Sequence, residues 1–244
     1  MKINRNYIKI FASVFVIVFF YSFTNQRNYK RALLPGVDIT YTDDSALYIS
    51  PDMVNKLLIQ NNGNVTGIAK EKLVLSNLEA TLNANEMIRD ADVYVTINGQ
   101  VKVTIQQKQP IARVSGAAPF YIDSEGGVMP LSPVFSARVP LITGTVNKKE
   151  LTDVYALASY IYKDDFLRKN VIGIHQQGKK FDIRFRIDNF IVKLGETGNM
   201  ETKFNNLKAF YQKALKDNTL NNYSTVNLAF KNQIVCTKRK THGI

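Results

Sequence analysis

The sequence is poor in the residues on which most enzyme and metal sites depend. It holds one cysteine, Cys236, and two histidines, His175 and His242, in 244 residues. A single cysteine cannot form a disulfide within the chain, so the stability of the fold must come from a buried core. A metal site or a Ser-His-Asp triad would have to rest on His175, because His242 lies in a polar tail. The alternating pattern around His175 is more typical of a sheet residue, and neither G-x-S-x-G nor H-E-x-x-H occurs.

Acidic residues are absent from both ends of the chain. Residues 1–31 carry six basic side chains and residues 231–244 carry four, in each case without an acid. The rest of the chain has 22 basic and 20 acidic residues, so the body carries a formal charge of only +2 out of the total of +12. Such a balanced body does not concentrate a polyanion, and we predict no nucleic-acid partner.

Charge of either sign is absent from residues 10–26, and the run 10-IFASVFVIVFFYSF-23 is almost wholly apolar. These 17 residues are the lower limit for a helix that crosses about 30 Å of hydrocarbon. A secretory signal peptide is the alternative, but no A-x-A cleavage site follows. We therefore expect a transmembrane helix over 10–26, a cytoplasmic tail over 1–9, a linker over 27–35 and export of the long part that follows.

Residues 36–108 show the pattern of a small α+β domain. Ser50-Pro51-Asp52 is a helix start, and 76-SNLE-79 has the form of a capping box before a second short helix. Two alternating runs in 93-VYVTINGQVKVTIQ-106 flank Asn98-Gly99, which is a strong signal for a β-hairpin. With a strand at 37-VDITY-41, the predicted order is β-α-α-β-β.

Residues 109–237 are richer in strand patterns and predict a mostly antiparallel β-domain with two helices. The first helix is expected from Asn147, with Glu150 completing an N-cap pair, and the second over 200–215. Strands are expected at 111–114, 120–122, 171–176, 181–188 and 190–194, with a loop over 129–140. The chain closes with a hairpin of 225–230 and 233–237 around Lys231-Asn232, followed by a basic tail over 238–244.

Two stretches resemble ligand-binding motifs but are better explained as turns. In 121-YIDSEGGVMPL-131, Asp123 and Glu125 precede two glycines, but the distal glutamate of a calcium loop is missing. In 173-GIHQQGKK-180, Lys180 stands where a phosphate loop needs Ser or Thr, and a strand follows instead of a helix. We predict no catalytic residue, metal, cofactor or small-molecule substrate. An envelope hydrolase using His175 with Asp123 or Asp182 remains the enzymatic alternative.

Several blocks of residues resemble the FtsQ/DivIB family of bacterial cell-division proteins. The most specific are 78-LEATLNANEMIRDADVYV-95 and 108-KQPIAR-113, together with Tyr121-Ile122-Asp123, Gly126 or Gly127, and Met129-Pro130-Leu131. The block 193-KLGETGNMETKFNNLKAFYQKAL-215 and the closing hairpin are similar too. Glu86 departs from the proline that members of the family often carry at its position.

The resemblance implies a POTRA domain over 36–108, a β-domain over 109–237 and a non-enzymatic scaffold of the divisome. It further implies a single-pass protein of the inner membrane at the division septum, with exported domains in the periplasm. Partners would be FtsB- and FtsL-type proteins, with other division proteins bound by the POTRA domain. A POTRA-type chaperone for outer-membrane protein assembly is the alternative function.

A C-terminal strand usually lies at a sheet edge, where its unpaired backbone groups can accept an extended peptide. In this family, FtsB adds a strand beside the last β-strands, so the resemblance places partner binding on the final hairpin. A proline at Val235 is expected to remove a strand amide and to abolish partner capture without unfolding the domain. The predicted binding residues are Thr225, Val226, Asn227, Leu228, Ala229, Phe230, Lys231, Gln233, Ile234, Val235, Cys236 and Thr237.

Overall fold

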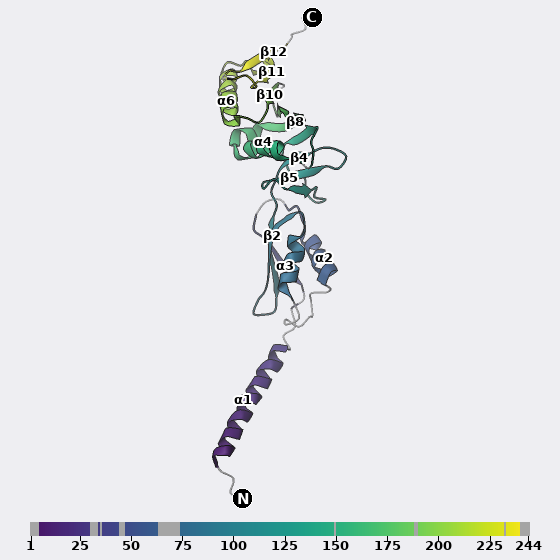
Figure 1. Cartoon of the computed structure of the whole chain (residues 1–244), viewed down its shortest axis with the longest axis vertical. Coiled ribbons are helices and arrows are strands. Elements are labelled where there is room, and N and C mark those ends of the chain that lie inside the picture. Colours follow the sequence, from purple (N-terminus) through teal and green to yellow (C-terminus); the bar gives the residue numbers. More distant parts are fainter. Residues whose placement is uncertain are drawn as a thin grey trace. The chain divides into compact units, whose positions relative to one another are not determined.

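The structure is a computed structural model that describes residues 5–29, 34, 36–43, 47–62, 74–148, 150–187, 190–231 and 233–239. The chain divides into two compact units, Met1–Gln107 and Lys108–Ile244 (Figure 1). Residues 1–4 of the predicted cytoplasmic tail, most of the predicted linker, Asn232 of the last turn and residues 240–244 of the basic tail lie outside the described residues.

The predicted apolar segment forms helix α1, Arg5–Tyr29. Its large apolar side chains between Phe11 and Tyr21 are 49% to 75% exposed. Within the part of the chain that the structure describes, no helix has the length and apolar content needed to cross a bilayer. The predicted helix over 10–26 is confirmed, and its crossing of a membrane stays a prediction.

The rest of the first unit is a three-stranded sheet with two helices (Figure 1). Its elements are β1 (Val37–Tyr41), α2 (Pro51–Asn62), α3 (Leu75–Asn83), β2 (Ile88–Val95) and β3 (Val101–Gln107). The strand order is β1-β3-β2, with β1 parallel and β2 antiparallel to β3. Alternate strand residues and the apolar stripes of both helices are buried in one core. The predicted β-α-α-β-β order is confirmed.

Only one of the two predicted helix starts in this unit is correct. Ser50 Oγ accepts a hydrogen bond from Met53 N–H at 3.3 Å, as expected of an N-cap. The capping box 76-SNLE-79 is wrong, because α3 already begins at Leu75 and its N-cap position, Val74, makes no side-chain hydrogen bond. Glu79 instead accepts a hydrogen bond at 3.0 Å from the backbone N–H of Val93 on β2.

The second unit is a nine-stranded sheet with helices packed on one face. Its strands are β4 (Pro110–Val114), β5 (Phe120–Asp123), β6 (Val128–Pro130), β7 (Leu141–Gly144), β8 (Val171–Gln177), β9 (Lys180–Phe185), β10 (Ile191–Gly195), β11 (Tyr223–Asn227) and β12 (Val235–Lys238). Its helices are α4 (Thr152–Lys163), α5 (Asp165–Asn170), α6 (Met200–Lys216) and the short 3-10 helix η2 (Leu220–Asn222). The strand order is β12-β11-β10-β9-β8-β7-β4-β5-β6. Figure 1 shows α4 and α6 on the same side of the strands.

Several details of the β-domain differ from the predictions. Helix α4 begins at Thr152 and not at Asn147, since its N-cap position is Leu151 and the first helical turn carries Asp153. The short helix α5 and the strand β7 were not predicted. The last two strands are shorter than the predicted 225–230 and 233–237, because Leu228 to Ile234 form no strand where the structure describes them. Five strand pairings are antiparallel and three are parallel, so the sheet is mostly antiparallel as expected.

An ion pair joins the helices that cover the sheet. Asp164 caps α5 by accepting from Leu167 N–H at 3.0 Å, and its other carboxylate oxygen pairs with Lys208 on α6. Burial by itself raises the pKa of Asp164, but the hydrogen bonds from Lys208 and Leu167 outweigh burial and hold this pKa below its usual value. The charged form of Asp164 therefore stabilises the fold.

We expect Asp164→Ala to lower the free energy of unfolding by about 2 kcal/mol at neutral pH. Because the pKa of this carboxyl is lower in the folded state, its contribution is present above about pH 4 and is lost as the pH falls below that value. Urea unfolding at pH 7 and pH 3 should therefore show a smaller difference at pH 3. Asp165→Ala is the control, because that side chain is 70% exposed, and it should cost less than about 0.5 kcal/mol. Equal losses in both variants would contradict this account.

Candidate protein-interaction site

The final hairpin lies at one end of the nine-stranded sheet. Among the described residues, β12 has β11 as its only neighbouring strand, so its other side is an open edge. The pairing is antiparallel, with Val226 opposite Cys236 and Asn227 opposite Val235. An open edge presents backbone N–H and C=O groups that a further strand can pair with. The predicted edge position of the last strand is therefore what the structure has.

Two backbone hydrogen bonds fix which residues of β12 face that edge. Leu228 N–H donates to Lys193 O on β10, so Asn227 and Thr225 direct their backbone groups the other way, toward β12. On β12, Arg239 N–H donates to Asn222 O, so residues 239, 237 and 235 face β11. Cys236 and Lys238 consequently direct their N–H and C=O groups to the open edge. Val235 faces β11, so a proline there removes a strand amide of the β11–β12 pairing, and the expectation that it abolishes partner capture without unfolding the domain is wrong.

Side chains of the hairpin alternate between two faces. Val226 and Leu228 are buried on the helix side, and Ile234 and Cys236 pack partly buried against the same core. Burial raises the pKa of the Cys236 thiol, which makes it a poor nucleophile. A strand added beside β12 would therefore place alternate side chains next to Ile234 and Cys236 on the helix side.

The segment between β11 and β12 is held against the end of β10. Ala229 N–H donates to Asn227 Oδ1 at 2.9 Å. Gly195, at φ +73°, approaches the same segment so closely that a Cβ there would lie 3.1 Å from the Ala229 Cβ. Glycine suits this position because it tolerates a positive φ and leaves room for Ala229.

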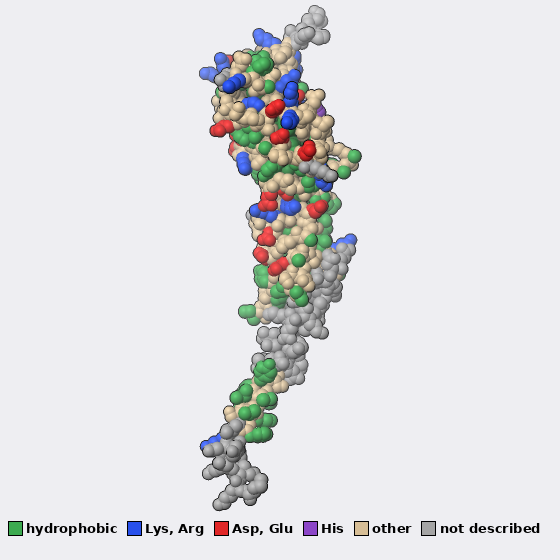
Figure 2. Space-filling model, viewed as in Figure 1, with side chains coloured by type: hydrophobic (Ala, Val, Ile, Leu, Met, Phe, Trp, Pro, Cys, Tyr) green, Lys and Arg blue, Asp and Glu red, His purple; other side chains and the backbone are tan. Residues whose placement is uncertain are grey.

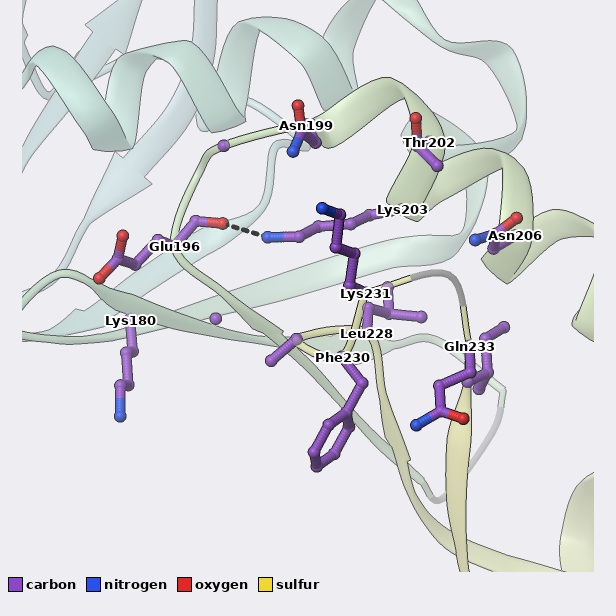
Figure 3. Close-up of a pocket in the computed structure, with 14 residues that line it drawn as sticks. Lys180, Glu196, Asn199, Thr202, Lys203, Asn206, Leu228, Phe230, Lys231 and Gln233 are labelled. Atoms are coloured by element: carbon purple, nitrogen blue, oxygen red, sulfur yellow. Dashed lines mark hydrogen bonds between the residues drawn. The ribbon is translucent and has the colours of Figure 1, made fainter.

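A groove of about 680 Å³ separates this segment from the first turns of α6 (Figure 3). Its walls are Leu228 to Lys231, Gln233 and Ile234 on one side and Asn199, Thr202, Lys203 and Asn206 on the other, with Lys180, Gly195, Glu196 and Gly198 completing it. Half of the predicted binding residues thus line one hollow at the turn that precedes β12. Phe230, one of these residues, is 49% exposed.

The groove is basic. Lys180, Lys203 and Lys231 line it together with a single acidic residue, Glu196. Lys203 Nζ donates to the backbone oxygen of Glu196 at 2.6 Å, as Figure 3 shows. Burial lowers the pKa of Lys203, and the nearby Glu196 carboxylate raises it in part. Figure 2 shows further Lys and Arg side chains gathered around this end of the β-domain.

The opposite edge of the sheet is less suited to pairing. It belongs to β6, which has three residues and ends at Pro130. Proline donates no hydrogen bond and is a common way to blunt an edge. The two edges of the sheet therefore differ. Every residue of β12 has a backbone N–H, whereas β6 lacks one at Pro130.

The acidic turn at 123–127 is structural. Asp123, 2% exposed, accepts hydrogen bonds from Glu125 N–H at 2.9 Å and from Gly127 N–H at 2.7 Å. Tyr155 on α4 packs on Gly126 and donates to Ser124 O. The Asp123 carboxylate is thus occupied by its own turn, as the predicted turn requires.

Of the residues named for the hydrolase alternative, the structure brings His175 and Asp182 together across β8 and β9 and leaves Asp123 in its own turn. His175 lies opposite Asp182 on the uncovered face of the sheet, and its Nδ1 lies 3.0 Å from Thr143 Oγ1. Asp123 is buried in the turn described above. Within the 173–180 motif, residues 173–177 belong to β8 and Lys180 begins β9, and Gly178 at φ +60° lies in the tight turn between them, as predicted.

The fold and the open edge define a class of protein in which a POTRA-like unit precedes a β-domain with a free terminal strand. Comparison with family models agrees: the POTRA-like domain matches residues 36–106, and FtsQ/DivIB, C-terminal related, matches residues 109–237. The chain belongs to the FtsQ/DivIB C-terminal related family. Both families are generally structural or scaffolding domains, and the second indicates a role in cell division through protein interactions. No curated protein matches the chain.

Proposed function

We propose that this protein is a non-enzymatic scaffold of the bacterial divisome that captures a partner by adding the partner's strand to β12. The observation that carries the proposal is the open edge, where Cys236 and Lys238 direct their backbone groups away from β11. The partner is a small subunit of the FtsB or FtsL type. The contrast with β6, which Pro130 blunts, supports β12 as the docking edge.

In this proposal, the groove at the turn before β12 gives the capture its selectivity. Two outward residues offer only a few main-chain hydrogen bonds, each contributing about 1 kcal/mol. Side chains must therefore supply most of the affinity and the choice of partner. A segment with an apolar residue over Ile234 and an acidic residue near Lys203 and Lys231 fits the lining.

The same proposal includes the cellular location. Residues 10–26 carry no charge, and the large apolar side chains of α1 between Phe11 and Tyr21 are exposed. We infer an anchor in the inner membrane with the POTRA-like and β-domains in the periplasm at the septum. A POTRA-type chaperone is less well supported, because the match over 109–237 favours division.

Depletion of the protein is expected to produce filamentous cells with unfinished septa, because a scaffold that is missing stalls wall synthesis at the division site. Cell length and septal staining during depletion measure this. A fluorescent fusion should collect at midcell, and the fusion lacking residues 10–26 should not. Dividing cells of normal length after depletion would contradict the proposed function.

A further inference from the structure

A second edge strand, β2, has one of its outward backbone groups hydrogen-bonded by a side chain of its own domain. Strand β2 has eight residues, and among the described residues β3 is its only neighbouring strand. The N–H of Val93, in the second half of β2, donates to Glu79 Oε1 on α3 at 3.0 Å. Glu79 therefore has no role at the start of its own helix and a definite one at the edge of the sheet.

The geometry of the hairpin shows that Val93 faces the open side. Thr96 N–H donates to Gln100 O at 2.9 Å, which directs Thr96, and by alternation Tyr94 and Asp92, toward β3. Ala91, Val93 and Val95 consequently direct their backbone groups outward. Glu79 accepts the hydrogen bond of the middle residue of these three, Val93.

The three outward positions are complementary to those of a second copy of the same strand. An antiparallel pairing with its two-fold axis at Val93 sets Val93 against Val93 and Ala91 against Val95, and each such pair can exchange two main-chain hydrogen bonds. On the exposed face, Asp92 then lies opposite Tyr94, so no like charges meet. The edge would pair with itself if its amides were free.

We propose that Glu79 is a gate on the β2 edge, and that the occupant it excludes is the β2 edge of a second copy of this chain. Its carboxylate takes the central N–H that the second strand needs. The two-fold axis would also bring both Glu79 carboxylates beside the same Val93 pair, where they repel. The gate leaves strand addition to β12, a consequence that rests on the proposed function, whereas the exclusion of a second copy does not.

The test compares the oligomeric state of the full-length chain and its variants in detergent, by sedimentation with the detergent density-matched. Glu79→Ala is expected to sediment as a dimer at concentrations where the unaltered chain is a monomer. Glu79→Gln should stay monomeric, because the carboxamide oxygen still accepts from Val93 N–H. Amide exchange of Val93 should be slow in the unaltered chain and slow in Glu79→Ala only when it is dimeric.

A blocking variant makes the pairing specific. Adding Asp92→Lys and Tyr94→Lys to Glu79→Ala sets lysine opposite lysine across the axis and should restore the monomer, and both positions are exposed. The proposal is overturned if Glu79→Ala stays monomeric at every concentration, if its dimer survives the two lysines, or if Glu79→Gln dimerises as readily. None of these measurements involves the β12 partner, so they fail or succeed separately from the proposed function.

Discussion

Cys236→Pro is expected to weaken partner capture at least tenfold while the β-domain stays folded. The substitution removes the N–H that Cys236 directs to the open edge, and the proline ring occupies the place of the partner's carbonyl. A lost hydrogen bond of about 1 kcal/mol, together with a partner carbonyl left unpaired at about 1–3 kcal/mol, exceeds the 1.4 kcal/mol of a tenfold change. Titration of the partner's periplasmic segment measures the effect.

Two variants separate the edge amide from other effects of that substitution. Cys236→Ala removes the same thiol and keeps the N–H, so its affinity should stay within a few-fold of the original. Val235→Pro removes an N–H that faces β11, so it should loosen the hairpin itself and lower the thermal midpoint. Equal losses of binding in Cys236→Ala and Cys236→Pro would assign the contact to the side chain and contradict strand addition.

Gly144→Ala is expected to be the most damaging single methyl group in the β-domain. Gly144 ends β7 at φ +100°, and a Cβ there would lie 2.0 Å from the backbone oxygen of Gln176 on β8. Gly144 and Gln176 lie opposite each other in paired strands, so neither backbone can move away without breaking the β7–β8 ladder. We expect a loss of about 3 kcal/mol or more in the free energy of unfolding, out of the 5–15 kcal/mol typical of a domain.

Gly178→Ala is the matched control. Gly178 also has a positive φ, +60°, but no atom lies within 4 Å of its Cβ position. Its alanine variant should therefore carry only the conformational cost of about 1–2 kcal/mol. Denaturant unfolding of both variants isolates the collision at Gly144. Similar losses in the two would show that β7 and β8 do not pair as described.

Features set by neighbouring residues were predictable from the sequence. The Asn98-Gly99 hairpin and the Ser50 cap depend on contacts a few residues apart, and both are present. Glu79 was misassigned because its partner, Val93, lies 14 residues away on another element. Strand β7 was missed because its four residues follow a proline-rich loop and pair in parallel with strands distant in sequence.

For the candidate site, the edge position of the last strand was predictable from the sequence, and its outward amides were not. A terminal strand pattern was enough to place the last strand at an edge. Which of its amides point outward depends on the pairing of β10, β11 and β12, including the irregularity between Tyr223 and Thr225. In that register the N–H of Cys236, and not that of Val235, points to the open edge. The groove beside α6 also depends on tertiary packing, since its lysines come from three separate segments.

Amide hydrogen exchange of β12, measured with and without the partner's periplasmic segment, tests the central claim most directly. The account predicts that the N–H groups of Cys236 and Lys238 exchange quickly in the free protein and become protected on binding. Those of Val235 and Thr237, already directed to β11, should change little. Tight binding that leaves Cys236 and Lys238 unprotected would contradict capture by strand addition.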